Sequence, residues 1–148
     1  MNAEPLSVRF AITLTQPWAS LMAYGVKTVE TRSRRTRYIG WIAIHAAKNF
    51  PEECRQLCYQ EPFLTALKDC DRPLPIGAVV AVTRIIGCTP TANFTRISET
   101  ERAFGDYGAR RYGYITHGVR RLREPIPMRG SQTIPWVMPR VITEEDLI

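Results

Sequence analysis

Apolar and polar residues alternate along several short runs of this chain, and prolines and glycines separate the runs. Arg9 to Leu14 and Gly40 to Ala46 show the pattern most clearly, because residues two apart share one face of a strand. In the second run, Trp41 and His45 fall on the same face. Further strands are expected at Val26 to Ser33, Ala78 to Ile86, Tyr112 to Leu122 (with Gly118 as a bulge or break) and Val137 to Ile142.

Helical patterns are few and short. Thr15-Gln16-Pro17 is typical of a helix start, since Thr15 or Gln16 can cap and proline suits the first helical position. This helix is expected to end at Gly25. Pro51 to Lys68 predicts two short helices divided at Pro62, and Glu99 to Phe104 predicts one helical turn. Packing must stabilise elements this short, because their intrinsic propensity is too small.

Many short strands, few helices and 11 prolines predict a mostly-β fold with helices (α+β), a small β-barrel with short flanking helices. The length of 148 residues fits a single domain over residues 1–148, with its core at about 8–142. No repeat, linker or low-complexity stretch divides the chain. No apolar run reaches the roughly 18 residues that a membrane span requires.

The charge of the chain points towards nucleic acid. Its formal net charge is +6, and 17 of the 20 basic residues are arginine, whose planar fork binds phosphate and stacks on bases. An arginine-rich genome composition is the alternative explanation of that ratio. Between Pro5 and Pro51, however, the only acidic residue among seven basic ones is Glu30. A lone carboxylate in a basic segment suggests a specific role.

The four cysteines lack the paired spacing of a zinc site, so we expect reduced structural thiols, no metal and no cofactor. The segment from Met1 to Ser7 has no secretory signal pattern. The sequence therefore predicts an intracellular, cytoplasmic protein that does not enter a membrane, and it leaves a nuclear location open.

Three polar residues, Lys27, Glu30 and Arg32, follow the expected helix end at Gly25. In a regular strand Glu30 and Arg32 share a face, and Lys27 joins them only from the turn before the strand. From the spacing alone, an Arg32–Glu30 ion pair on the sheet surface is the simpler interpretation.

This stretch resembles the ASCH family (activating signal cointegrator homology domain), a branch of the PUA-like barrels. The family signature Gly-x-Lys-x-x-Glu-x-Arg reads here as Gly25-Val-Lys27-Thr-Val-Glu30-Thr-Arg32. Trp136 follows the Gly130-Ser-Gln132 block later than a tryptophan usually does in the family. The resemblance extends over about residues 10–136, through Gln16-Pro17-Trp18-Ala19, Gly40 to Ala46, Pro75 to Cys88, Phe104 to Tyr107 and Pro125 to Gln132.

The resemblance implies a cleft lined by the polar residues of the motif and a role in binding RNA, in RNA processing, translation or transcription coactivation. Some relatives are hydrolases, either ribonucleases or amidohydrolases that act on an N4-acylated cytidine. In those amidohydrolases a threonine nucleophile stands where this chain has Glu30. Lys27 beside a carboxylate forms an ion pair and is a poor base, so the departure argues against that branch.

For binding, Lys27 and Arg32 are expected to contact phosphates and Glu30 to accept from the amino group of a base. Trp18 or Trp41 is expected to stack on a base, with core packing as the alternative for Trp18. The remaining candidate ligand-binding residues are Gln16, His45, Arg34, Arg35 and Arg37.

An enlarged phosphate-binding surface is expected if two of three arginine groups lie together. The groups are Arg34, Arg35 and Arg37; Arg110 and Arg111; and Arg120, Arg121 and Arg123.

Three functions remain open from the sequence. The favoured one is a module that binds RNA or a nucleotide-like ligand. The second is a hydrolase in the same cleft, with Lys27, Glu30 and His45 as catalytic residues unless His45 is only a hydrogen-bonded strand residue. The third is an adaptor with protein partners, for which an exposed apolar patch outside the cleft would be the mark.

Overall fold

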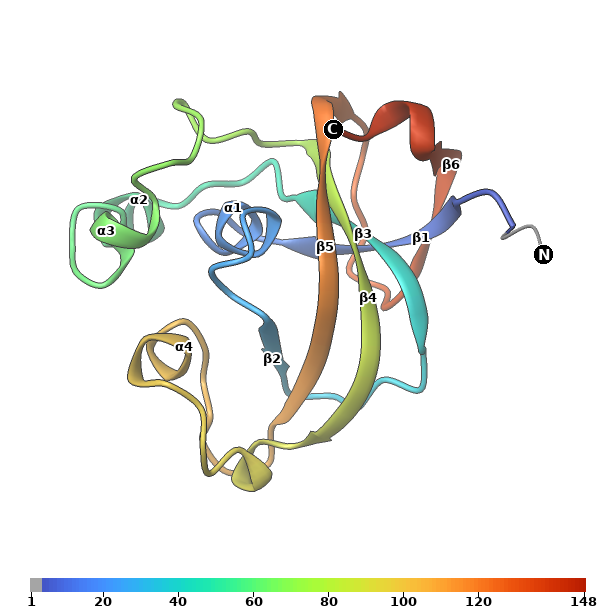
Figure 1. Ribbon diagram of the computed structural model, residues 1–148. Helices are drawn as coiled ribbons and strands as arrows, with labels where there is room; N and C mark the ends of the chain where they lie inside the picture. The colour runs from blue at the N-terminus through green and yellow to red at the C-terminus, as the bar shows by residue number, and fades with distance from the viewer. Residues whose placement is uncertain (1–3) are drawn as a thin grey trace.

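A computed structural model describes residues 4–148 (Figure 1). Its strands are β1 (Ser7–Leu14), β2 (Val29–Arg32), β3 (Gly40–Ala46), β4 (Ala78–Pro90), β5 (Tyr112–Pro127) and β6 (Trp136–Thr143). They form one curved sheet in the order β2-β5-β4-β3-β1-β6, in which only the β1–β3 pair is parallel among the described residues. The mostly-β α+β class is confirmed. The sequence predicts a closed barrel, but the strands form an open curved sheet. The edge strands β2 and β6 do not pair with each other in the described chain.

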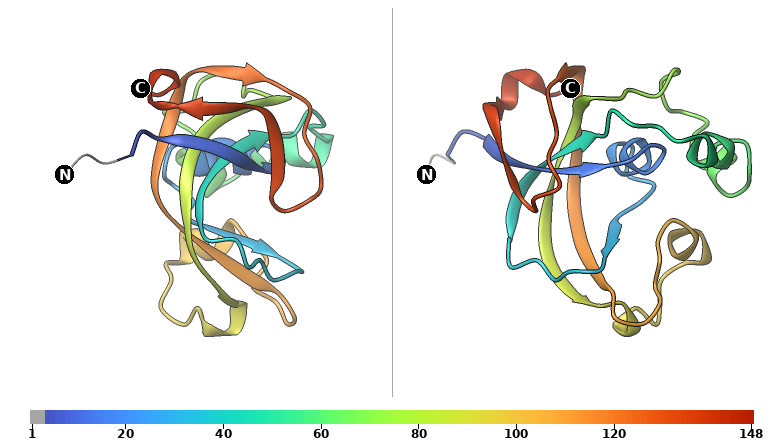
Figure 2. Two further views of the ribbon diagram at one scale, coloured as in Figure 1. Left: turned by 90° about the vertical axis from the view of Figure 1, so that its right-hand side faces the viewer. Right: turned by 180° about the vertical axis from the view of Figure 1, so that it is seen from behind.

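The long strands β4 and β5 give the sheet its curvature (Figure 2). Their pairing shifts between Val82↔Arg120 and Arg84↔His117, which leaves one extra residue on β5. Gly118 lies in this bulge with a φ of 75° and confirms the interruption expected there. A bulge bends a strand and increases its twist. Strand β5 continues past the bulge to Pro127, beyond the expected end at Leu122.

The helical elements are α1 (Trp18–Ala23), α2 (Glu52–Leu57), α3 (Phe63–Ala66), η1 (Thr91–Asn93), α4 (Glu99–Ala103) and η2 (Glu144–Asp146). The helices α1 to α4 lie on one side of β4 and β5, whereas the short helical turn η2 lies beside β6 (Figures 1 and 2). None of those in residues 4–148 is long and apolar enough to cross a membrane. The expected division at Pro62 is confirmed, because one short helix ends before it and another begins after it.

Packing on several sides holds the six-residue helix α1. Met22 packs with the strands in one apolar cluster, whereas Leu21 packs with Phe63 and Phe104 in another cluster beneath α2 and α3. Trp18 contacts both clusters. A further cluster lies around β6 and includes Trp136. Because α1 is buried between the sheet and the outer helices, it can present its first residue to the site at a defined place.

Gly25 ends α1 as expected, and the way it does so displaces β2. Its φ of 75° lets the Gly25 amide donate to Met22 O and the Val26 amide donate to Leu21 O. The Lys27 amide also donates to Leu21 O, at 3.1 Å. Residues 26–28 are therefore engaged with the helix end, and β2 begins at Val29 rather than at Val26. Lys27 consequently lies in the turn before the strand.

Candidate functional site

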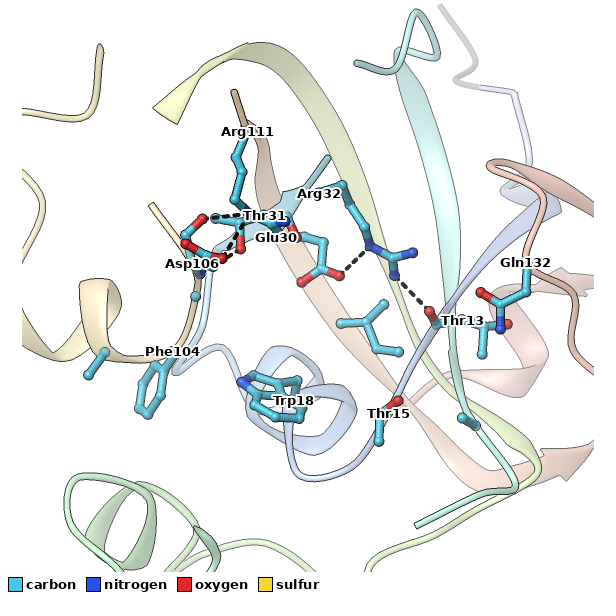
Figure 3. Close-up of a pocket in the computed structure, with 14 residues that line it drawn as sticks. Thr13, Thr15, Trp18, Glu30, Thr31, Arg32, Phe104, Asp106, Arg111 and Gln132 are labelled. Atoms are coloured by element: carbon cyan, nitrogen blue, oxygen red, sulfur yellow. Dashed lines mark hydrogen bonds and ion pairs between the residues drawn. The ribbon is translucent and has the colours of Figure 1, made fainter. Parts of the chain in front are cut away.

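A cleft of about 470 Å³ opens between β2, the end of β1 and the segment that follows α4 (Figure 3). Glu30, Thr31 and Arg32 come from β2, and the side chain of Trp18 comes from the start of α1. The remaining lining residues are Thr13, Leu14, Thr15, Ala47, Ala103, Phe104, Gly105, Asp106, Arg111 and Gln132. The cleft therefore combines segments from both ends of the chain.

Lys27 lies beneath this cleft and does not line it. Its side chain is 1% exposed, and its ammonium group is 3.4 Å from Glu30 Oε1. The same group donates to Val29 O and, at 3.3 Å, to Phe104 O. An ammonium has three N–H donors, and these three partners account for all of them. The expected phosphate contact from Lys27 is therefore not available, because its charge is used to hold the carboxylate of Glu30.

Glu30 and Arg32 are the charged groups of β2 that reach the cleft, with side chains 12% and 22% exposed. Arg32 Nε donates to Glu30 Oε2 at 2.7 Å, and Arg32 Nη2 donates to Thr13 O at 2.7 Å. Three strands separate β2 from β1 in the sheet order, so this arginine joins two distant strands across the open end of the curved sheet. The carboxylate is thereby held between two cations.

Both groups keep capacity for a ligand. Arg32 Nη1 has no hydrogen-bond partner among the described residues. A carboxylate has about four lone-pair positions, so Glu30 can accept further hydrogen bonds on the cleft side. One cationic donor and one anionic acceptor thus face the same cavity.

The loop between α4 and β5 forms the opposite wall. Arg111 Nε donates to Asp106 O at 2.9 Å, and Arg111 Nη2 donates to Thr31 O at 3.2 Å. The Asp106 amide donates to Thr31 Oγ1 at 3.0 Å. These bonds fasten the loop to β2, which carries Glu30 and Arg32.

Comparison with known proteins shows which family this chain belongs to. The family model described as the ASCH domain matches residues 12–123. This chain belongs to the ASCH domain family.

Known ASCH-containing proteins share part of the sequence and the fold. Over 89 residues the chain is 35% identical to activating signal cointegrator 1 of Homo sapiens and 33% identical to that of Mus musculus. Each match covers 57% of this chain but only 15% of the relative. A crystal structure of a mutant ASCH protein from Zymomonas mobilis has a TM-score of 0.50 at 15% identity, over 93% of this chain and 91% of that one. The last likeness concerns the fold alone.

The ASCH cleft includes Trp18, but two other predicted ligand residues lie elsewhere. Gln16 is fully buried, accepts from the Ser20 amide at 3.0 Å and donates to Pro75 O at 2.7 Å. It therefore holds α1 against the segment before β4. Trp41 packs against the apolar cluster around β6 and lies 5.9 Å from the guanidinium of Arg84, so it does not line the cleft.

His45 also lies away from Glu30, in a neighbouring hollow. Its Nε2 donates to Met128 O at 2.7 Å, and its Nδ1 accepts from the Thr13 hydroxyl at 3.1 Å. That hydroxyl oxygen in turn accepts from Trp136 Nε1 at 3.0 Å. Burial lowers the pKa of His45 below its ordinary value of 6.5, so the ring is neutral at pH 7. Both ring nitrogens are used by the protein, as expected for a hydrogen-bonded strand histidine.

The three arginine groups named from the sequence divide into two regions. The loop after β2 carries Arg34, Arg35 and Arg37, and the guanidinium of Arg35 lies 5.4 Å from the ring centre of Tyr112. Tyr112 directly follows Arg110 and Arg111, so two of the three groups meet at one end of the β2–β5 pair.

The third group lies further along β5, against the C-terminal segment. There Arg120 lies 2.6 Å from Glu144, and Arg123 donates to Leu147 O at 2.9 Å. The guanidinium of Arg121 lies over the ring of Tyr24. The acidic residues of the tail therefore offset part of this basic group.

Potential metal ligands do not gather among residues 4–148, where no cluster of three or more histidine, cysteine or acidic side chains has a metal-binding arrangement. The four cysteines are free, and burial raises the pKa of the Cys70 thiol to about 11. Sequence reasoning missed Thr13, Thr31, Asp106 and Gln132 as cleft residues. A signal for two of them existed, because Asp106 and Gln132 lie in blocks shared with the family.

Proposed function

We propose that this ASCH domain binds single-stranded RNA, with one base beside Glu30 and a phosphate on Arg32. The observation that carries the proposal is the exposed side of a carboxylate held between two cations in a cleft of about 470 Å³. That volume lies within the roughly 300–1,000 Å³ of small-ligand sites.

The chemistry of the cleft suits a base that carries an amino group. A glutamate is a recognised acceptor for the N4 amino group of cytosine. Arg32 retains N–H donors for a phosphate, and Trp18 offers an aromatic surface for stacking. The arginines at the β2–β5 end supply the electrostatic attraction that single-stranded RNA requires.

The family context suggests where such binding is used. The relatives that match are named activating signal cointegrator 1, and this chain covers 15% of their length. We propose that the chain is a single RNA-binding domain, serving transcription coactivation, RNA processing or translation. We propose that the domain also recruits protein partners while it is bound to RNA.

Binding fits the geometry better than hydrolysis does. Lys27 has no hydroxyl partner among the described residues and is fully engaged by its ion pair and two carbonyls. His45 is held in its own network, away from Glu30. A general base and acid must both reach the reacting group. Of the three catalytic residues that the sequence suggested, only Glu30 lines the cleft.

The proposal is tested with oligocytidylate and oligouridylate of equal length, titrated into the protein at two salt concentrations. We expect oligocytidylate to bind about tenfold more tightly, because uracil lacks an amino group for Glu30. Glu30→Gln should reduce that preference, since an amide both donates and accepts. Equal binding of the two oligomers by the wild-type protein would contradict the role of Glu30.

A matched pair of arginine variants tests the phosphate contact. Arg32→Gln should weaken the binding of both oligomers about tenfold, whereas Arg9→Gln, an exposed residue outside the cleft, should not. Circular dichroism checks that both variants fold. The RNA is then run on a gel, and cleavage that disappears in Glu30→Gln would replace the binding proposal with a ribonuclease.

A further inference from the structure

A second hollow of about 1,020 Å³ lies next to the cleft. Its walls come from the loop between β5 and β6, from residues 47–49 after β3 and from Gly77 before β4. Thr13, Ala47 and Gln132 line both the hollow and the cleft. The two cavities therefore adjoin over the ends of the parallel strands β1 and β3, and together they are called the groove below.

The second hollow carries positive charge that the protein does not use. Lys48 and Arg129 line it, and both are exposed. Among residues 4–148, neither side chain has a partner in a salt bridge or a side-chain hydrogen bond. No acidic side chain from the described residues lines this hollow, in contrast to the cleft with its Glu30 and Asp106. An anion is the ligand that this arrangement favours.

The wall of the hollow is tightly packed. A Cβ atom on Gly130 would lie 2.5 Å from His45 Cε1 and 2.8 Å from Thr13 Oγ1, so the loop lies directly on the histidine. His45 is itself held by Met128 O and the Thr13 hydroxyl. The backbone that carries Arg129 is therefore positioned before any ligand binds, which lowers the entropic cost of binding.

We propose that the RNA strand continues from the cleft into this second hollow, where Lys48 and Arg129 bind the phosphates next to the base held at Glu30. The proposal rests on the proposed function and extends it, because it makes the ligand an oligonucleotide rather than a single nucleotide. Gln132, which lines both cavities, lies where the strand crosses from one to the other.

The test compares cytidine 5′-monophosphate with tetracytidylate, using calorimetry on the full chain. The wild-type protein should bind tetracytidylate at least tenfold more tightly than the mononucleotide. The Lys48→Ala/Arg129→Ala double variant should lose about tenfold for tetracytidylate and keep the wild-type affinity for the mononucleotide. Its slope of log affinity against log salt should fall by about 1.4, the value for two phosphate contacts on a single strand.

The control is Arg9→Ala/Lys68→Ala, which removes the same charge from exposed residues that line neither cavity. An equal loss in the two double variants would show attraction by net charge only and would overturn the proposal. So would a tetracytidylate affinity no higher than that of the mononucleotide. If the wild-type protein binds neither ligand, the proposed function itself fails, which distinguishes the two failures.

Discussion

At the scale of single residues, the lysine of the motif has a different role from the one its charge suggests. Lys27 is 1% exposed, and its ammonium group contacts Glu30 and the carbonyl oxygen of Phe104. It therefore positions the carboxylate and joins β2 to the end of α4. Removing this buried ammonium group leaves Phe104 O without its donor and leaves Arg32 as the remaining counterion of Glu30.

We expect Lys27→Ala to lower the free energy of unfolding by about 2–4 kcal/mol, because Val29 O and Phe104 O lose their buried donor and the removed side chain leaves a cavity, while Glu30 keeps Arg32 as its counterion. The measurement is urea unfolding, with the exposed Lys48→Ala as a control that should stay within about 0.5 kcal/mol. The double variant Lys27→Met/Glu30→Gln should recover part of the loss, since it removes both charges. A loss below about 1 kcal/mol in Lys27→Ala would contradict a structural role for this lysine.

The buried imidazole of His45 makes stability depend on pH. Because burial lowers its pKa from 6.5, the unfolded chain binds a proton at about pH 6 that the folded chain does not bind. The free energy of unfolding should therefore fall as the pH drops below about 6.5, by up to about 1.4 kcal/mol per pH unit, until the folded state is protonated too.

Urea unfolding between about pH 7.5 and about pH 5.5 tests this linkage. His45→Gln should reduce the loss of stability at the lower pH, whereas the exposed His117→Gln should retain it. An identical pH dependence in all three proteins would exclude His45 as its source.

At the scale of elements, the loop between β5 and β6 reaches the strands by a close backbone approach. Gly130 lies against His45 and Thr13, with no room for a Cβ atom. The hydrogen bond from His45 Nε2 to Met128 O holds the same loop two residues earlier. One wall of the groove therefore depends on a residue without a side chain.

Gly130→Ala should lower the free energy of unfolding by about 1–3 kcal/mol, the usual cost of overpacking. Gly87→Ala is the matched control, because a Cβ atom there meets only Ile115 Cδ1 at an ordinary 3.6 Å. Thermal melting compares the two variants. Equal melting temperatures would mean that the loop moves away without cost and is not held by His45.

At the scale of the whole molecule, charge is distributed unevenly over β5. Its first residues lie near Arg34 and Arg35, which have no acidic partners among the described residues. Its later part lies against the C-terminal segment, where Glu144 contacts Arg120. The end of the sheet beside the cleft is therefore the one suited to attract RNA.

Two double variants of equal charge test this asymmetry. Arg34→Ala/Arg35→Ala should weaken RNA binding several-fold and lower the salt slope by about 1.4. Arg120→Ala/Arg123→Ala should change the affinity less than twofold, because those arginines contact the C-terminal segment and do not lie at the start of β5 beside the cleft. The measurement is the same RNA titration over a salt series, and equal losses would show that only net charge matters.

The sequence by itself determined the order of the elements and the motif that identifies the family. The strand at Gly40 to Ala46, the division at Pro62 and the helix end at Gly25 depend on local features, and each appears where expected. Blocks of residues spread along the chain also indicated where the cleft would form. Local chemistry suffices for these, because strand periodicity and a glycine with positive φ act within a few residues.

Only the tertiary structure decided what each polar group of the site does. Lys27 is buried because the carbonyl of Phe104, 77 residues away in sequence, meets its ammonium group. His45 faces a separate hollow because the carbonyl oxygen of Met128, 83 residues away, accepts a hydrogen bond from its Nε2. Arg32 connects β2 to β1 because the sheet curves, and curvature depends on pairing between distant strands. Side-chain spacing cannot specify such partners, since burial and hydrogen bonding depend on segments that meet only when the chain folds.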